Sequence, residues 1–163
     1  MTEGTLHRTS TPDHGLGQCP RVHGLIESSI YVKDLGRARE FYERVLNLSV
    51  AGNASSSRLV AFWVGPGQVL LVCKRGGSLG AIELRGGRIP PHDGRGPLHF
   101  AIGVDEDSRE QWRHRLAQFD IPITGEVDWS TGGWSLYFDD PDGHVIELKS
   151  SDWNGRPVPG GST

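Results

Sequence analysis

The stretch YFDDPDGHVIELK, residues 137–149, has the pattern of two β-strands joined by a turn, and it decides the fold because it occurs twice. The earlier stretch FWVGPGQVLLVCK, residues 62–74, echoes it turn for turn. Proline and glycine mark the turn in each copy, and strand-forming apolar residues flank it. An internal repeat of this kind predicts a chain built from two similar modules.

Each hairpin ends a longer unit that also occurs twice. In the first unit, a strand at 26–32 precedes a helix within DLGRAREFYERVLNL, residues 34–48, whose apolar side chains recur at helical spacing. Asp34 can cap the start of this helix, and Asn47 suits its left-handed end. Further strands are expected at 48–50, 59–64 and 69–73. The second unit repeats the order, with a helix at 107–119 and strands at 98–104, 121–127, 134–138 and 145–149.

Neither unit could bury its sheet alone, so the two should share a core. We expect an α+β fold in which two βαβββ modules form a curved, half-closed mixed β-barrel around a cleft. The domain itself should cover residues 23–153, with module 1 at about 24–75, a linker loop at 76–96 and module 2 at 97–153. Flexible tails are expected at 1–22 and 154–163.

The linker is rich in glycine and proline, and the sequence leaves two interpretations of it open. It could be a simple connection with one short strand at 81–84. It could instead be a loop over the mouth of the cleft, because long ordered loops often carry function.

The composition suits an ordinary globular domain that binds a small molecule. With a net charge of -3, the chain lacks the basic face that nucleic-acid binding needs. No run approaches the roughly 18 apolar residues of a membrane span, and the first residues lack the apolar stretch of a signal peptide. Cys19 and Cys73 lie far apart, without metal or redox spacing. We therefore expect a cytoplasmic protein with neither a nucleic acid nor a membrane as partner.

The chemistry-bearing residues emerge when the two modules are aligned at their first strands. ESSIYVKD then lies on HFAIGVDE, so that Glu27 falls on His99, and the final strand HVIELKS carries Glu147. Three metal-capable side chains thus occupy related positions near the ends of strands that line one cleft, which predicts a metal site. Each alone has an ordinary interpretation: a strand-end charge for Glu27, an arginine partner for Glu147 and a core histidine for His99.

Two longer stretches carry a family resemblance: YVKDLGRAREFYERVLNL, residues 31–48, and GGWSLYFDDPDGHVIEL, residues 132–148. Over about residues 24–153 the chain resembles the vicinal oxygen chelate superfamily. That superfamily holds glyoxalase I, extradiol dioxygenases, methylmalonyl-CoA epimerase, fosfomycin-modifying transferases and bleomycin-binding proteins. The likeness is greatest to uncharacterised bacterial members. The resemblance implies Glu27, His99 and Glu147 as ligands of one divalent ion (Zn, Ni, Mn, Fe or Mg), and a homodimer.

The sequence departs from the family pattern at two positions. Many active members have histidine where this chain has Glu27, and extradiol dioxygenases need two histidines and one carboxylate. Glyoxalase I has a fourth protein ligand in the last strand of its first module. Here that strand offers only Leu71 or Val72, depending on the register. These departures weigh against a dioxygenase and against a true glyoxalase I.

The resemblance also implies roles for further residues. Glu147 and Glu27 are expected to be catalytic, because one carboxylate could leave the metal and act as general base. The residues expected to bind substrate are Ser29, Tyr31, Ser135 and Tyr137. In fosfomycin-modifying transferases, a serine and a tyrosine that match the last two help to hold the anionic substrate, but the lysine of those enzymes would map near Val127.

The function predicted in this way is that of a metal-dependent lyase or isomerase acting on a small substrate with vicinal oxygens. A small-molecule or antibiotic binding protein without catalysis is the alternative, and a ring-cleaving or other dioxygenase is a further one. Outside the site, His144 is expected only to close a turn. The arginines of the second helix, Arg109, Arg113 and Arg115, are expected to form a solvated face.

Overall fold

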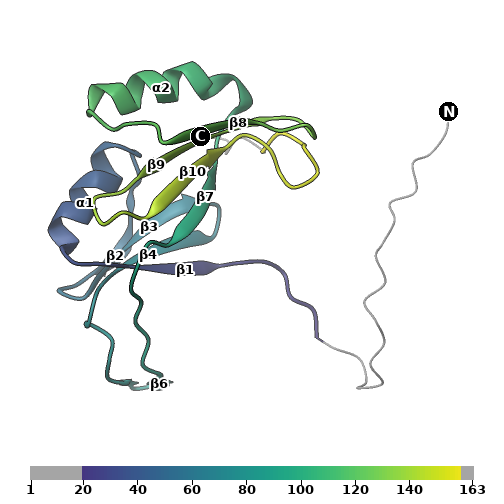
Figure 1. The fold of residues 1–163 in the computed structure, drawn as a ribbon. Coiled ribbons are helices and arrows are strands. Elements are labelled where there is room, and N and C mark those ends of the chain that lie inside the picture. The colour runs from purple at the N-terminus through teal and green to yellow at the C-terminus, as the bar shows by residue number, and fades with distance from the viewer. Residues whose placement is uncertain (1–19, 159–163) are drawn as a thin grey trace.

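The computed structural model describes residues 20–158, apart from the side chains of residues 53 and 54, and confirms the repeated order of elements (Figure 1). Module 1 contains β1 (Glu27–Val32), α1 (Leu35–Arg44), β2 (Val50–Ser55), β3 (Leu59–Gly65) and β4 (Gln68–Lys74). Module 2 contains β7 (His99–Gly103), the 3-10 helix η1 (Glu106–Ser108), α2 (Arg109–Gln118), β8 (Gly125–Asp128), β9 (Trp134–Asp139) and β10 (Val145–Lys149). Each module is βαβββ, as predicted.

The strands of each module form one mixed four-stranded sheet. Sheet 1 has the order β1-β4-β3-β2, and sheet 2 has the order β7-β10-β9-β8. In each sheet the first strand of the module runs parallel to the last, and the other neighbours are antiparallel. Within residues 20–158 no ladder joins β1 to β7, so these two strands are edges of separate sheets. The predicted α+β fold class is confirmed.

The strand register shows which residues of the two modules correspond. In sheet 2, Glu147 lies opposite the residue two positions after His99. In sheet 1, Leu71 lies opposite the residue two positions after Glu27. Leu71 therefore takes the place in module 1 that Glu147 takes in module 2. The two similar sequence stretches would align Glu147 with Val72, so the structural repeat is shifted by one residue from the sequence repeat.

Local signals in the sequence explain where α1 begins and ends. The side chain of Asp34 accepts a hydrogen bond from the backbone N–H of Arg37 at 3.0 Å, which confirms the predicted cap. The chain leaves the helix through Asn47, whose φ of 54° lies in the left-handed region. The face turned to sheet 1 buries Ala38, Phe41 and Tyr42.

The two modules share one hydrophobic core, and buried polar side chains join them across it. The Nδ1 of His144 accepts the N–H of Leu98 at 3.0 Å, and its Nε2 donates to the carbonyl of Tyr31 at 3.0 Å. The hydroxyl of Tyr42 donates to the carboxylate of Asp140 at 2.8 Å. His144 is fully buried and holds module 1 against module 2, so its role is larger than the closing of a turn.

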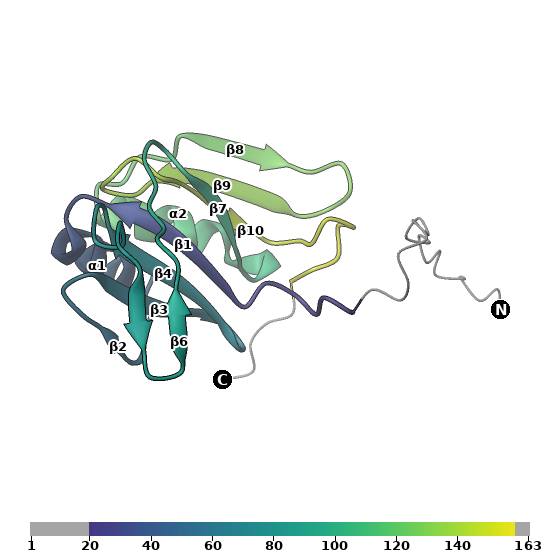
Figure 2. The same cartoon turned by 90° about the horizontal axis from the view of Figure 1, so that it is seen from below.

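The linker forms a small hairpin of its own, from β5 (Ile82–Leu84) and β6 (Gly87–Ile89). Figure 1 shows this hairpin below the two sheets, and Figure 2, seen from below, shows it in front of sheet 1. The first strand agrees with the one expected at 81–84, and the second was not expected from the sequence. The prediction of a plain connection is therefore incomplete.

The chain beyond β10 folds back on module 2. Ser151 forms an isolated bridge with Pro157, and the N–H of Val158 donates to the carbonyl of Ser150 at 3.1 Å. The segment expected to begin a C-terminal tail is thus ordered against the sheet as far as Val158. Most of the expected N-terminal tail lies outside the described residues. None of the helices in the described part of the chain is long and apolar enough to span a membrane.

Candidate functional site

Two of the three predicted metal ligands lie together on the open face of sheet 2. His99 begins β7, and Glu147 lies in the neighbouring strand β10. The Nε2 of His99 is 3.3 Å from Oε2 of Glu147. The Glu147 side chain is only 8% exposed, whereas that of His99 is 52% exposed. Within this pair, the carboxylate of Glu147 is buried and the imidazole of His99 is accessible to solvent.

The hydrogen bonds of His99 identify which of its ring nitrogens can bind a cation. Its Nδ1 is 3.1 Å from the carbonyl oxygen of Val145, which can only accept, so Nδ1 carries the proton. In the neutral imidazole, Nε2 is then an acceptor, and it faces the carboxylate oxygen of Glu147, a second acceptor. Two acceptors in contact require a cation between or beside them, either a proton or a metal ion. A backbone carbonyl that orients the second nitrogen is the usual support of a metal-binding histidine.

Glu147 is held in place by two side chains of the β8–β9 hairpin. The hydroxyl of Ser135 donates to Oε1 of Glu147 at 2.6 Å, and the indole N–H of Trp129 donates to Ser135 Oγ at 2.7 Å. Ser135 is fully buried. Because Oε1 is engaged in this chain of hydrogen bonds, Oε2 is the oxygen that remains for His99 and a cation.

Tyr137, which the sequence predicts to line the cleft, lies beside this pair. It is the direct partner of Glu147 across the β9–β10 ladder, and its ring centroid is 6.1 Å from that of His99. Burial, and then the nearby carboxylate of Glu147, raise the pKa of the Tyr137 hydroxyl. Tyr137 therefore keeps its proton at neutral pH and can donate it in a hydrogen bond.

Glu27, the third predicted ligand, lies at the exposed start of β1 in sheet 1. It shares with His99 a cavity of about 440 Å³ between β1 and β7. Within the described residues, however, no three His, Cys, Asp or Glu side chains come close enough to hold a metal ion together. A single copy of the chain thus brings two of the three predicted ligands together.

The linker lies over Tyr31, one of the two predicted substrate residues of module 1. The Tyr31 hydroxyl is 2.8 Å from Nδ1 of His92, and Asp93 accepts the N–H of Gly76. Burial is the main cause that raises the pKa of the Tyr31 hydroxyl. Ser29, two residues earlier on the same face of β1, is half-buried.

Replacing Gly94 by alanine should loosen the linker from Tyr31. A Cβ at this position would come within 2.4 Å of Cδ2 of the Tyr31 ring, so either the ring or the loop must move. We expect a loss of about 1–3 kcal/mol in the free energy of unfolding and faster trypsin cleavage at the linker arginines. Gly80→Ala, in the same linker with open space around its Cβ, is the matched control. Equal cleavage rates in the two variants would contradict the tight contact.

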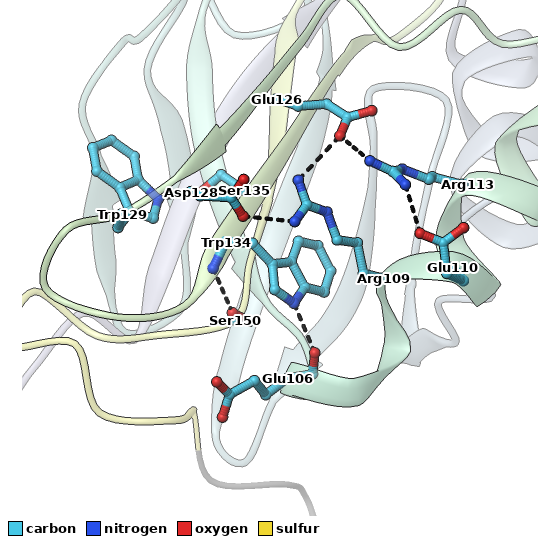
Figure 3. Close-up of polar contacts among 10 residues, drawn as sticks. All are labelled: Glu106, Arg109, Glu110, Arg113, Glu126, Asp128, Trp129, Trp134, Ser135 and Ser150. Carbon is cyan, nitrogen blue, oxygen red and sulfur yellow. Dashed lines mark hydrogen bonds and ion pairs between the residues drawn. The ribbon is translucent and has the colours of Figure 1, made fainter.

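The arginines of α2 hold the hairpin that carries Ser135 (Figure 3). Arg109 donates to Asp128 at 2.6 Å and to Glu126 at 3.1 Å. Arg113 also binds Glu126, and this contact is the main cause that lowers the pKa of the Glu126 carboxyl. The expectation of a solvated arginine face is wrong, because these side chains cross from α2 to β8.

Arg115 makes a different contact, with module 1. Its guanidinium donates to the backbone carbonyls of Val45 at 2.5 Å and Arg44 at 2.6 Å, where α1 ends. A cation at this end of a helix is favourable because the last carbonyls have no partner within the helix. Arg115 thus helps to join the modules.

Sequence reasoning missed two residues of the site, Lys149 and Trp129. Lys149 is two residues after Glu147 on a strand, so the period of two could have placed it on the same face. Trp129 reaches the site through its hydrogen bond to Ser135 across the β8–β9 hairpin, and no local sequence pattern predicts that hydrogen bond.

Comparison with known proteins agrees with the family resemblance of the sequence. The model of the Glyoxalase/Bleomycin resistance protein/Dioxygenase superfamily matches residues 23–148. A search of curated proteins found no match.

Several solved structures have a similar fold. A lactoylglutathione lyase from Agrobacterium tumefaciens is 27% identical, with a TM-score of 0.69 over 80% of this chain and 95% of that chain. An integron cassette protein from the Halifax Harbour sewage metagenome is 24% identical, with a TM-score of 0.61 over 78% of this chain and 98% of that chain. A fosfomycin resistance protein from Listeria monocytogenes is 21% identical, with a TM-score of 0.57 over 83% of this chain and 92% of that chain. That structure was solved with Mn(II) and 1S,2S-dihydroxypropylphosphonic acid.

Proposed function

Because the chain belongs to the Glyoxalase/Bleomycin resistance protein/Dioxygenase superfamily, we propose that it is a divalent-metal-dependent lyase or isomerase that acts on a small substrate with vicinal oxygens. The observation that carries the proposal is the contact of two acceptors, His99 Nε2 and Glu147 Oε2, at 3.3 Å. A metal ion bound by both atoms would bridge them, as a proton on Nε2 would. The name of the 27% identical Agrobacterium neighbour, a lyase, agrees with the proposed class of reaction.

The donor atoms fit a divalent ion of the borderline or hard kind. His99 and Glu147 would hold it with one nitrogen and one oxygen, and Glu27 would add a second carboxylate. Zn, Ni, Mn, Fe and Mg are compatible with this set. When bound, the ion would chelate the two vicinal oxygens of the substrate and stabilise negative charge on them.

The protein's own residues would orient the substrate and move a proton. Glu147 is fixed by Ser135, whereas Glu27 is exposed and free of such contacts among the described residues, so we assign the general base to a carboxylate oxygen of Glu27. Tyr137 keeps its proton and would donate a hydrogen bond to a substrate oxygen. Ser29 and Tyr31 would line the opposite wall.

We further propose that the protein is a homodimer in which Glu27 of a second copy completes the site. Two observations support this arrangement. One copy does not gather three ligands within the described residues, and β1 and β7 are both edge strands that a second copy could cover.

The test of the metal site is elemental analysis of protein purified without chelator. We expect about one divalent ion per chain in the wild type and a loss of affinity of at least about tenfold in His99→Ala. His114→Ala, on the exposed face of α2, is the control and should keep the metal. Equal metal content in His99→Ala and wild type would overturn the assignment.

The shared site can be tested by mixing two variants that should each lose the metal, Glu27→Gln and His99→Ala. If each site uses residues of both copies, a mixed dimer has one intact site, and random exchange of subunits should restore about one site in four. If Glu27 serves the site of its own chain, no metal binding returns. Sedimentation that shows only a monomer at micromolar concentration would also contradict the dimer.

Lys149 gives a specific reason to keep a second candidate, a small-molecule binding protein without catalysis. Its ammonium is 3.8 Å from Glu147 Oε1 and could balance the carboxylate without a metal. Wild-type protein that binds no divalent ion at all would favour this candidate.

A further inference from the structure

Lys149 brings a positive charge to the site that the proposed metal chemistry does not use. It lies in β10 two residues after Glu147 and therefore on the same face of sheet 2. Its side chain is only 18% exposed, and its Nζ is 3.8 Å from Oε1 of Glu147. That distance is a charge contact and is too long for a hydrogen bond. Within residues 20–158 the ammonium has no hydrogen bond, so its three N–H groups remain available to a ligand.

Aromatic side chains hold the ammonium in place. Nζ lies 4.0 Å from the ring centroid of Trp129 and 6.0 Å from that of Trp153. The Trp129 indole is itself fixed by its hydrogen bond to Ser135, so the cation rests on a rigid ring. Trp129 is 37% exposed and Trp153 is 92% exposed. Both rings therefore leave surface beside the ammonium on which a planar ligand could pack.

The residues opposite Lys149 in the two neighbouring strands are small. Lys149 lies opposite Gly103 in β7 and Ser135 in β9. The side chain of Val158 lies against Gly103, with Cγ1 2.6 Å from the place where a Cβ would be. The ordered segment after β10 thus packs against this face of β7 beside Gly103.

The charges at the site indicate which ligand would fit. This step rests on the proposed function: two carboxylates, Glu27 and Glu147, balance the +2 charge of the ion, and Lys149 then leaves one positive charge. A substrate with a single negative charge near its two chelating oxygens would neutralise it. We propose that Lys149 is a specificity-determining residue that selects substrates carrying a carboxylate in addition to their vicinal oxygens, with the planar part of the substrate against Trp129.

The test uses a matched pair of probes, 3,4-dihydroxybenzoate and catechol, which share two vicinal oxygens and differ by one carboxylate. Binding to the Mn²⁺-loaded full-length protein is measured by calorimetry under nitrogen. We expect the wild type to bind 3,4-dihydroxybenzoate about tenfold more tightly than catechol, as one charge-assisted contact would give. In Lys149→Met this ratio should fall to about one, while the affinity for catechol is kept.

Lys74→Met is the control, because Lys74 is an exposed lysine at the end of β4 in the other module. It should keep the wild-type ratio. Lys149→Gln serves as a second variant if the methionine variant does not fold, as judged by near-ultraviolet circular dichroism. An unchanged ratio in the folded Lys149 variant would overturn the proposal and leave Lys149 as a counter-ion of Glu147.

A metal-free arm separates this proposal from the proposed function. Benzoate is titrated into metal-free protein, and quenching of tryptophan fluorescence reports binding next to Trp129. If the wild type binds no Mn²⁺ but binds benzoate in a manner that Lys149→Met abolishes, the metal chemistry is wrong and the role of Lys149 stands. If benzoate binds equally to wild type and Lys149→Met, and the carboxylate gives no advantage with Mn²⁺ present, the role of Lys149 is refuted whether or not the metal binds.

Discussion

His144→Ala should lower the free energy of unfolding by about 3–4 kcal/mol. The imidazole is fully buried and links the N–H of Leu98 in module 2 to the carbonyl of Tyr31 in module 1. Its removal would leave the N–H of Leu98 without its partner, at a cost of about 1–3 kcal/mol, and open a cavity beside it. The Tyr31 carbonyl would lose one of its two donors and keep the other, Arg75 Nε at 3.0 Å. Because the bond to Tyr31 crosses between modules, the loss should affect the whole domain.

Urea unfolding followed by circular dichroism measures this effect. His144→Gln, whose amide can accept from one backbone group and donate to the other, should recover part of the loss. His114→Ala removes an exposed histidine from α2 and should change stability by less than about 0.5 kcal/mol. Similar stabilities of His144→Ala and His114→Ala would show that the modules do not depend on this link.

Asp140→Ala is expected to have the second largest effect, a loss of about 3 kcal/mol. The Asp140 carboxylate is 5% exposed and accepts three hydrogen bonds. The donors are the Tyr42 hydroxyl at 2.8 Å, the N–H of Asp142 at 2.9 Å and the N–H of His144 at 2.8 Å. Hydrogen bonds to a charged, buried acceptor are stronger than neutral ones, and alanine replaces none of them.

The neighbouring residue provides the control for this measurement. Asp139→Ala removes an exposed carboxylate one position earlier and should be nearly neutral. Tyr42→Phe should cost less than Asp140→Ala, because the two backbone donors keep their acceptor. If Asp140→Ala is no less stable than Asp139→Ala, the turn before β10 does not hold the modules together.

The order of elements and the two ends of the first helix follow from local patterns in the sequence. The recurrence of a strand, a helix and a hairpin is a local pattern, so it predicts two βαβββ modules without knowledge of how they pack. The cap at Asp34 and the left-handed residue Asn47 are local as well, because each acts on backbone within a few positions. The pairing of His99 with Glu147 was also accessible, since both sit at fixed places in their strands.

The contacts between strands and between modules depend on tertiary packing, which local patterns do not specify. Strand register depends on packing across the sheet, and it made Leu71, rather than Val72, the counterpart of Glu147. Position along the chain could not reveal that His144 joins two modules, because its partner Tyr31 lies 113 positions away. Distance along the chain also explains why the sequence did not predict two further features. These are the separation of Glu27 from His99 and Glu147, and the contacts of the α2 arginines with β8. Periodicity assigns a side chain to one face of a strand or helix. What that side chain contacts depends on how the faces are placed relative to one another, and packing of the shared core sets that placement.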